Sequence, residues 1–282
     1  MEKIRIITDS GSDIAQDFNS GITVLPMSIR FGEIEYLDGV NLSVNQFYEK
    51  LIESDELPTT SLITPAAFED VYRQSVEKGE KAIVITISGK LSGTYQSAVL
   101  AASEYENEVF VVDSKNVAIG ERILVLLALE LIKSGMTAKE IASRLEEEKE
   151  RIHLIAVLDT LEYLKKGGRI SKSVAFVGGA LSIKPVIAIK EGEVAIIGKA
   201  RGSRNGNNYL IKEIEETSGV DFTKPLCLGY SGLDDTMLKK YIEDSRQLWQ
   251  GYEDCLSISP IGATVGTHAG PGVIGVAFFE KV

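Results

Sequence analysis

Hydroxyl side chains and glycines follow two apolar runs in the first half of the sequence, and we interpret these runs as strands. The run 4–7 leads into the polar segment 8–13, and the run 82–87 leads into the segment 88–93. In open parallel sheets, ligands bind at the carboxyl ends of the strands. The sequence therefore predicts a binding site at this edge, where hydroxyl groups and backbone amides would suit an anionic oxygen.

The turn 88–93 is the most informative of these segments. Ser92 occupies the N-cap position of a helix that we expect to begin near Thr94. Gly89 and Gly93 allow the backbone to approach a ligand closely, and the positive end of the helix dipole favours an anion. Ordinary N-capping by Ser92 is the alternative interpretation of this turn.

Three further segments carry polar groups. Residues 59–61 are Thr-Thr-Ser and precede Thr64-Pro65, a pattern typical of a turn or a helix cap. His268 lies in the glycine-rich stretch 262–272, which we interpret as a loop between two strands that could face a ligand. The basic turn 165–171, Lys-Lys-Gly-Gly-Arg-Ile-Ser, could hold a phosphate group, although no Walker A or GxGxxG motif is present.

The composition narrows the class of protein. A formal net charge of -11 disfavours binding to nucleic acid and to anionic membrane surfaces. The apolar run 123–129 is too short to cross a bilayer, so we expect no stable membrane insertion. Cys227 and Cys255 stand in no metal-ligand or CxxC spacing, which predicts free thiols and a cytoplasmic location. The segment 165–204 is locally basic, with nine basic and two acidic residues.

Short β-branched runs alternate with amphipathic stretches, which predicts an α/β fold with mostly parallel or mixed sheets. We expect two α/β domains, residues 1–155 and 156–282, with the boundary after a Glu-rich helix. The predicted strands are 4–8, 22–31, 82–87, 109–112, 153–157, 185–189, 194–199, 226–230, 255–258 and 273–279. The predicted helices are 44–52, 66–77, 94–104, 117–133, 138–151, 161–165, 174–180, 207–216 and 235–249.

Taken together, these segments resemble the DegV proteins, the fatty-acid-binding subunits of bacterial fatty acid kinase. The resemblance covers the whole chain. It is carried by the following segments of the sequence: Thr8-Asp9-Ser10, Thr60-Ser61, Ser88-Gly89-Lys90-Leu91-Ser92-Gly93-Thr94-Tyr95-Gln96-Ser97-Ala98, Lys166-Gly167-Gly168-Arg169-Ile170 and Gly266-Thr267-His268-Ala269-Gly270-Pro271-Gly272.

This resemblance implies a DegV-like fold that holds one long-chain fatty acid in a buried tunnel, with the carboxylate at the domain junction. It further implies that a separate ATP-dependent kinase subunit phosphorylates the carboxylate to an acyl-phosphate for phospholipid synthesis. Apart from the bound fatty acid, it implies no cofactor, no metal and no catalytic residue. The carboxylate-binding residues that it implies are Thr60, Ser61, Ser92, Gly93 and His268. It places Arg169 and Arg201 at a phosphate-binding or kinase-docking surface.

Two other functions are compatible with the same residues. Ser92 as nucleophile, His268 as base and Asp9 as the orienting group would give a lipid esterase or thioesterase. Ser92 lacks the GxSxG context of an α/β-hydrolase, however. The second alternative is a binder of another small anion, such as a sugar phosphate or a nucleotide.

Overall fold

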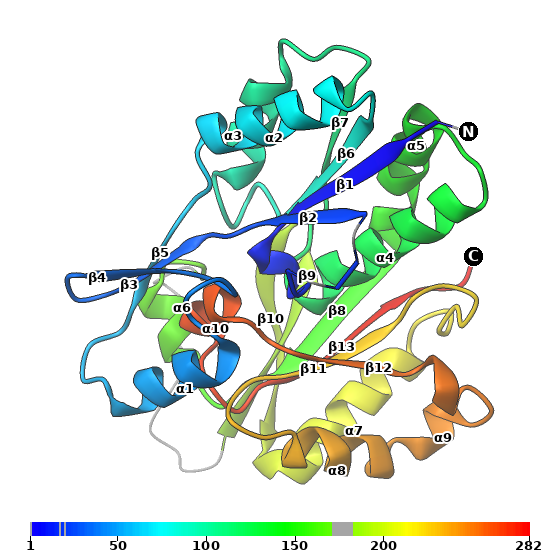
Figure 1. Cartoon of the computed structure of the whole chain (residues 1–282). Helices are drawn as coiled ribbons and strands as arrows, with labels where there is room; N and C mark the ends of the chain where they lie inside the picture. Colours follow the sequence, from blue (N-terminus) through cyan, green and yellow to red (C-terminus); the bar gives the residue numbers. More distant parts are fainter. Residues whose placement is uncertain (1, 17, 20, 171–182) are drawn as a thin grey trace.

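Alternating layers of helices and sheets build the molecule, seen in a computed structural model that describes residues 2–16, 18–19, 21–170 and 183–282 (Figure 1). The predicted helix 174–180 lies outside these described residues. The first sheet is four-stranded and parallel, with the order β2-β1-β6-β7. Its strands are β1 Ile4–Asp9, β2 Ile22–Leu25, β6 Lys81–Thr86 and β7 Val109–Asp113.

The second sheet is six-stranded and mixed, with the order β10-β9-β8-β13-β11-β12. Its neighbours are antiparallel except for the parallel pair β11 and β12. Its strands are β8 Ile152–Val157, β9 Ile183–Lys190, β10 Glu193–Arg201, β11 Cys227–Tyr230, β12 Ser257–Pro260 and β13 Ile274–Phe279. A smaller antiparallel sheet, ordered β4-β3-β5, contains β3 Ser28–Phe31, β4 Ile34–Leu37 and β5 Thr59–Ser61.

Helices cover both outer faces of the two large sheets and fill the space between them. The helices are α1 Val44–Glu53, α2 Pro65–Glu77, α3 Thr94–Ala102, α4 Ile119–Lys133, α5 Ala138–Glu148, α6 Glu162–Lys166, α7 Gly202–Glu215, α8 Thr236–Asp244, α9 Arg246–Trp249 and α10 Ala263–Ala269. Short 3-10 turns lie at Ser10–Ser12, Lys149–Arg151 and Glu253–Cys255.

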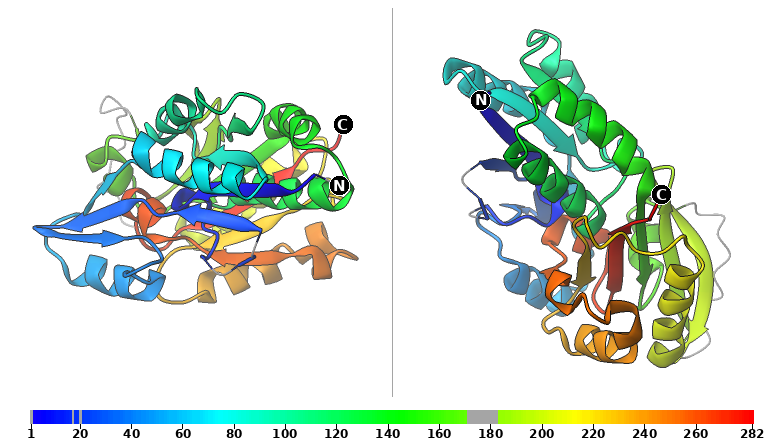
Figure 2. Two further views of the ribbon diagram at one scale, coloured as in Figure 1. Left: turned by 45° about the horizontal axis from the view of Figure 1, so that its top comes forward. Right: turned by 90° about the vertical axis from the view of Figure 1, so that its right-hand side faces the viewer.

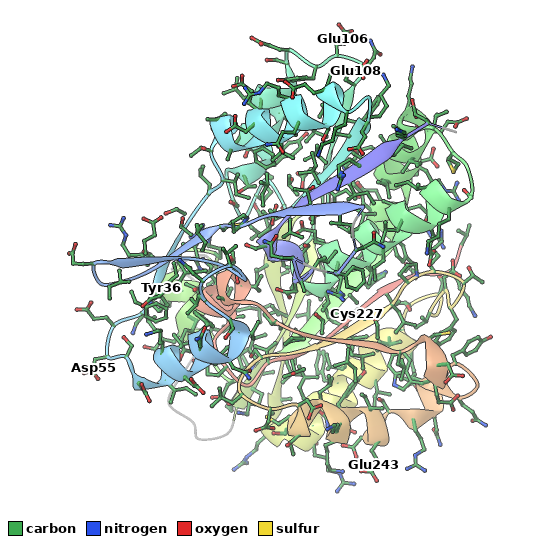
Figure 3. All side chains as sticks on the ribbon, in the orientation of Figure 1. Tyr36, Asp55, Glu106, Glu108, Cys227 and Glu243 are labelled. Atoms are coloured by element: carbon green, nitrogen blue, oxygen red, sulfur yellow. The ribbon has the colours of Figure 1, made fainter. Side chains whose placement is uncertain are left out.

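The apolar faces of these helices explain the layers. Helices α2 and α3 pack on the outer face of the four-stranded sheet, and α7 and α8 pack on the outer face of the six-stranded sheet. Helix α4 contacts strands of both sheets and fills the middle layer with α5, as the right-hand view of Figure 2 shows. Cys227 lies in this interior core, whereas Glu106 and Glu243 point outward at opposite ends of the layers (Figure 3).

The predicted α/β class with parallel and mixed sheets is confirmed. The division into residues 1–155 and 156–282 stays a prediction; residue 155 lies inside β8, a strand of the six-stranded sheet. No helix among the described residues is both long enough and apolar enough to cross a membrane.

Several predicted elements were wrong in extent. The single strand 22–31 is interrupted at Pro26, and its halves β2 and β3 belong to different sheets. Proline offers no N–H to a ladder, so it favours a break at this point. The predicted helix 235–249 divides at Ser245, whose hydroxyl donates to the Tyr241 carbonyl and accepts from Trp249 Nε1. Helix α7 begins at Gly202, before the predicted residue 207.

Candidate functional site

A cavity of about 420 Å³ lies between the start of α4, one face of the six-stranded sheet, and the helices α6 and α10. Most of its wall is apolar. The polar lining residues are Thr60, Ser61, Ser92, Arg169, Thr264 and His268. The structure thus brings together six residues predicted from the sequence: Thr60, Ser61, Ser92, Gly93, Arg169 and His268. Arg201 does not line this cavity; it is exposed at the start of α7.

Small residues in the centre of the six-stranded sheet leave room for the cavity. Ala156 of β8 lies opposite Gly275 of β13 on one side and Ile187 of β9 on the other. All three line the cavity. Because side chains alternate along a strand, Leu154 and Leu158 face the same space as Ala156.

The polar end of the cavity is organised by a hydrogen bond between two segments that are far apart in the sequence. Thr60 Oγ1 lies 2.9 Å from His268 Nε2. Thr60 is on β5, which pairs with β3 through Ile29, so the segment 59–61 is a strand and not the predicted turn or cap. The donor in the Thr60–His268 bond depends on the tautomer of the imidazole ring.

His268 lies on a helix where the sequence predicted a loop. Helix α10 spans Ala263–Ala269, and its first turn has no cap from its own neighbours in the sequence. The cap comes instead from Asp38, whose carboxylate accepts from the backbone N–H groups of Ala263 and Thr264. The prediction was wrong because this cap lies 225 residues away from Ala263 and no local pattern reveals it.

The segment 8–13 supports α10 and does not line the cavity, contrary to the expectation for this strand end. Ser10 Oγ lies 3.1 Å from Thr264 Oγ1, and Asp13 Oδ1 accepts from the N–H of Gly262 at 2.8 Å. Burial raises the pKa of Asp9 to about 7, although its carboxylate accepts from the N–H groups of Ile87 and Gly11. These contacts connect the ends of β1 and β6 with the helix that carries His268.

Ser92 lies one residue before the N-cap of α3, which is Gly93 and not Ser92 as predicted. Its hydroxyl is 2.9 Å from Thr94 Oγ1 and accepts a longer hydrogen bond from the Thr94 N–H. Gly93 lies under Leu62, because a Cβ at Gly93 would be 2.9 Å from Leu62 Cδ2. The hydrogen bonds to Thr94 therefore hold Ser92 at the cavity wall, and the absence of a side chain at Gly93 leaves space for Leu62.

The guanidinium of Arg169 joins two of the predicted turns. Its Nε donates to the Leu91 carbonyl at 3.1 Å, and its Nη1 donates to the Gly167 carbonyl at 2.7 Å. Burial lowers the pKa of Arg169 from its ordinary, strongly basic value, and the side chain stays a cation at neutral pH. Arg169 therefore supplies positive charge to the polar end while it connects the turn 88–93 to the turn 165–171.

A second pocket, of about 340 Å³, adjoins the polar end from outside. It shares Thr60, Arg169 and His268 with the cavity and also contains Lys166 and Tyr163. The Thr60–His268 pair therefore lies between an apolar interior and a polar outer pocket. A further pocket, of about 530 Å³, borders the cavity at Leu91, Arg169 and Val194.

His268 is neutral at physiological pH. Burial lowers the pKa of its imidazole to about 4, and the positive charge of Arg169 acts in the same direction. Its Nδ1 is buried and has no hydrogen-bond partner among the described residues. A neutral imidazole beside a threonine hydroxyl can donate to, or accept from, a ligand oxygen without forming an ion pair.

Sequence reasoning missed the reason for Gly167, a residue of the predicted basic turn. A Cβ at Gly167 would lie 2.1 Å from His268 Nδ1, far inside contact distance. The backbone of Gly167 has φ -73°, which any residue adopts, so the requirement for glycine comes from close contacts: chiefly the imidazole ring, and then the Tyr163 carbonyl oxygen at 3.0 Å. The sequence shows the pair Gly167-Gly168, but it does not show that His268 faces Gly167.

We expect Gly167→Ala to push the His268 ring away from Thr60 and toward solvent. The pKa of His268 should then rise from about 4 toward its ordinary value of 6.5, because the desolvation that lowers it is reduced. An NMR titration of the His268 imidazole signals measures this shift. Ser54→Ala, which lies outside the lining of both the cavity and the outer pocket, is the control. An unchanged His268 pKa in Gly167→Ala would contradict the steric argument.

Comparison with known proteins identifies the family to which this chain is similar. The model described as "Uncharacterised protein, DegV family" matches residues 3–281. A DegV domain-containing protein of Caldanaerobacter subterraneus subsp. tengcongensis is 35% identical over 286 residues, which cover 100% of both chains.

Comparison with solved structures identifies the same family. One is described as showing fatty acid binding of a DegV family protein from Thermus thermophilus; it has a TM-score of 0.87 and 32% identity, over 99% of this chain and 100% of that chain. The Streptococcus pneumoniae fatty acid kinase B3 protein, loaded with linoleic acid, has a TM-score of 0.85 over 99% of this chain and 100% of that chain; at 22% identity it shows a shared fold. The chain therefore belongs to the DegV family.

Proposed function

We propose that this protein binds one long-chain fatty acid in the cavity and presents its carboxylate to a separate ATP-dependent kinase subunit. The observation that carries the proposal is a largely apolar cavity of about 420 Å³ with polar groups at one end. Its volume lies within the range of about 300–1,000 Å³ typical of ligand pockets. The Thermus thermophilus relative described as fatty-acid-binding, at 32% identity, supports the same ligand class.

The hydrocarbon chain supplies most of the affinity. Each buried methylene contributes about 0.8 kcal/mol, so about fifteen methylenes contribute on the order of 12 kcal/mol before the costs of association. The wall that would receive them is formed by aliphatic side chains such as Ile119, Ile187 and Ile261. The polar end therefore needs to fix the position of the head group and need not supply the affinity.

The polar residues suit a carboxylate that must remain reactive. Thr60 and Ser92 offer neutral hydroxyls, and His268 is uncharged because burial lowers its pKa to about 4. Neutral hydrogen bonds contribute about 1 kcal/mol each, which orients the carboxylate without a bidentate ion pair. Arg169 is engaged with the carbonyls of Leu91 and Gly167. The carboxylate oxygens accordingly keep electron density for attack on a phosphoryl donor.

The outer pocket suits the transfer of a phosphoryl group. It contains Lys166 and Arg169 and shares Thr60 and His268 with the cavity. In the proposed reaction a carboxylate oxygen bonds to the γ-phosphorus of ATP while the bond to the ADP oxygen breaks. The products are an acyl-phosphate and ADP, and the two cations stabilise the transferred charge. Arg201 stays a candidate for kinase docking at the exposed start of α7.

The hydrogen bonds favour binding over hydrolysis. His268 Nε2 pairs with Thr60, the Ser92 hydroxyl pairs with Thr94, and the Asp9 carboxylate accepts from two backbone N–H groups. Each member of the alternative triad thus has a partner other than the one that a Ser–His–Asp mechanism needs.

Mass spectrometry of an organic extract from the purified protein tests the ligand class. We expect close to one fatty acid per chain in the wild type. Loss of both hydroxyls in a Thr60→Val, Ser92→Ala variant should weaken binding about thirtyfold, at about 1 kcal/mol for each hydrogen bond. Ser54→Ala, far from the cavity lining, is the control. An empty extract together with no binding of added fatty acid would refute the proposal.

A coupled assay tests the kinase role separately. The loaded protein, ATP and a fatty acid kinase subunit should together form an acyl-phosphate, which hydroxylamine traps as a hydroxamate. Omission of the kinase subunit should abolish the product. Hydroxamate formation without the kinase would instead indicate that this chain transfers the phosphoryl group alone.

A further inference from the structure

Along β8 the cavity runs from Leu158, which packs with Leu164 of α6 beside α10, to Leu154, and a row of side chains on three adjacent strands lines this second end. Val194 of β10 pairs with Ile189 of β9. The ladder between β8 and β9 ends at the pair Ile155 and Ala188, and Leu154 and Ile189 are the next residues beyond it. Leu154, Ile189 and Val194 all line the cavity.

The neighbouring row of the sheet differs in size from this end row. It consists of Gly275, Ala156 and Ile187, in register across β13, β8 and β9. On β8, Ala156 leaves space above the middle of the sheet, whereas Leu154 fills the corresponding space at the end; β9 carries isoleucine in both rows, at 187 and 189. The cavity therefore narrows at the row 154–189–194, which we call the end wall.

Another pocket adjoins the end wall. This end pocket, of about 340 Å³, shares Leu154 and Ile189 with the cavity. The rest of its lining includes the polar or charged residues Lys115, Asn116, Lys149, Glu150, Lys190 and Glu191. Leu154 and Ile189 therefore border both spaces.

Contacts around the end pocket hold the end wall in place. The tip of the β9–β10 hairpin is fixed where the Ser88 hydroxyl donates to the Gly192 carbonyl at 2.7 Å. On the opposite side, Lys115 Nζ lies 2.6 Å from Glu150 Oε1 and 3.9 Å from Glu191 Oε2. The hairpin that carries Ile189 is therefore tied to the turn after β6 and to the residues that precede β8.

We infer that Leu154 and Ile189 set the maximum length of the acyl chain that this protein accepts. A longer chain would have to displace this aliphatic pair and place its methyl end beside the charged groups of the end pocket, where burial of apolar surface is lost. The inference rests on the proposed function and specifies its substrate class: straight-chain fatty acids up to a limit set by the end wall.

Truncation of the end wall should open the cavity to longer chains. The probe is a mixture of saturated fatty acids of even chain length, from dodecanoic to docosanoic acid, in competition for the purified, delipidated protein. For Leu154→Ala and for Ile189→Ala, we expect the affinity for the first acid that the wild type excludes to rise about tenfold, because about two more methylenes become buried. Ile189→Phe should move the limit in the opposite direction, toward shorter acids.

Matched controls come from the opposite face of the same strands. Val157 and Val186 pack in the core beneath α7 and do not line either space. Val157→Ala and Val186→Ala therefore remove apolar bulk from β8 and β9 without changing the end wall, and the chain-length limit should stay at its wild-type value.

The outcomes separate the two proposals. A shifted limit in the end-wall variants with an unshifted limit in the controls supports the inference. If the wild type binds fatty acids and no end-wall variant, including Ile189→Phe, changes the limit, the inference is wrong and the proposed function stands. If the wild type binds none of the acids, the proposed function itself fails.

Discussion

We expect the Ala156→Phe variant to fold normally and to lose its fatty acid. Ala156 faces the middle of the cavity between Gly275 and Ile187. A phenyl ring at this position would occupy the path of the acyl chain and exclude about four methylenes, which costs about 3 kcal/mol and more than a hundredfold in affinity. The extract of the purified variant, analysed by mass spectrometry, should contain little fatty acid.

The same substitution should not destabilise the empty protein. An engineered ring normally overpacks a core, but the phenyl ring of the Ala156→Phe variant would enter a cavity of about 420 Å³ that is lined by aliphatic groups. We therefore expect the melting temperature of the delipidated variant to equal or exceed that of the delipidated wild type. Ala195→Phe is the control: Ala195 alternates with the cavity-lining Val194 on β10, so its side chain points to the other face. Retention of the fatty acid by Ala156→Phe would place the acyl chain elsewhere.

Local signals in the sequence predicted the elements well where those signals are strong. Helix α5 begins at Thr137, and the expected start is stabilised by a capping box in which the Thr137 and Glu140 side chains bond to each other's backbone N–H groups. Helix α2 begins after Thr64 with proline at its first position, as the Thr-Pro pair predicted. In both helices the start is encoded within four residues, so no tertiary contact is needed to find it.

Features that depend on distant contacts could not be predicted from the sequence. Helix α10 looked like a loop because its cap, Asp38, comes from a distant part of the chain. The cavity wall was equally hidden: Leu154 and Ile155 are adjacent apolar residues of β8, yet one lines the cavity and the other packs beneath α7. Apolar periodicity identifies two buried faces of a strand but does not distinguish a packed face from a hollow one.

The polar residues of the site were found for a different reason. Thr60, Ser92 and His268 lie in segments with glycines and hydroxyl groups, which are unusual for a protein interior. The resemblance to the DegV family identified these segments, in this order along the chain, as one set. Their grouping at one end of the cavity agrees with that expectation. Their assigned role in binding the carboxylate stays a prediction.

A buried carboxyl in the middle layer gives the second large effect. Glu121 of α4 is fully buried; its Oε1 accepts from the Thr8 hydroxyl, and its Oε2 has no partner among the described residues. Burial raises the pKa of Glu121 well above its usual range, and the nearby carboxyl of Asp9 raises it further, while the Thr8 hydrogen bond acts in the opposite direction. The folded protein therefore keeps a proton on Glu121 that the unfolded chain releases at lower pH.

The sign of the resulting pH dependence follows from proton binding. Below the ordinary pKa of 4.5, both states hold the proton and Glu121 adds no pH dependence. Above it, unfolding releases the proton, so the free energy of unfolding falls by up to about 1.4 kcal/mol per pH unit until the pH reaches the raised value. Glutamine at this position cannot titrate, so the Glu121→Gln variant lacks this loss.

We therefore expect the stability of Glu121→Gln relative to the wild type to increase steadily as the pH rises from about 5 to about 7, by more than about 1.4 kcal/mol in total. Urea unfolding at several pH values measures this slope. Burial of the glutamine amide changes the free energy of unfolding by the same amount at every pH. It therefore shifts the difference in stability between the two proteins by a constant and does not alter the pH dependence of that difference. Glu140→Gln is the control: hydrogen bonds from Thr137 lower the pKa of that exposed carboxyl below its ordinary value of 4.5, so both states are ionised from pH 5 to 7 and the stability curve should run parallel to that of the wild type. Parallel stability curves for Glu121→Gln and the wild type would show that Glu121 is ionised in the folded protein. Polar groups would then have to stabilise the negative charge at Oε2.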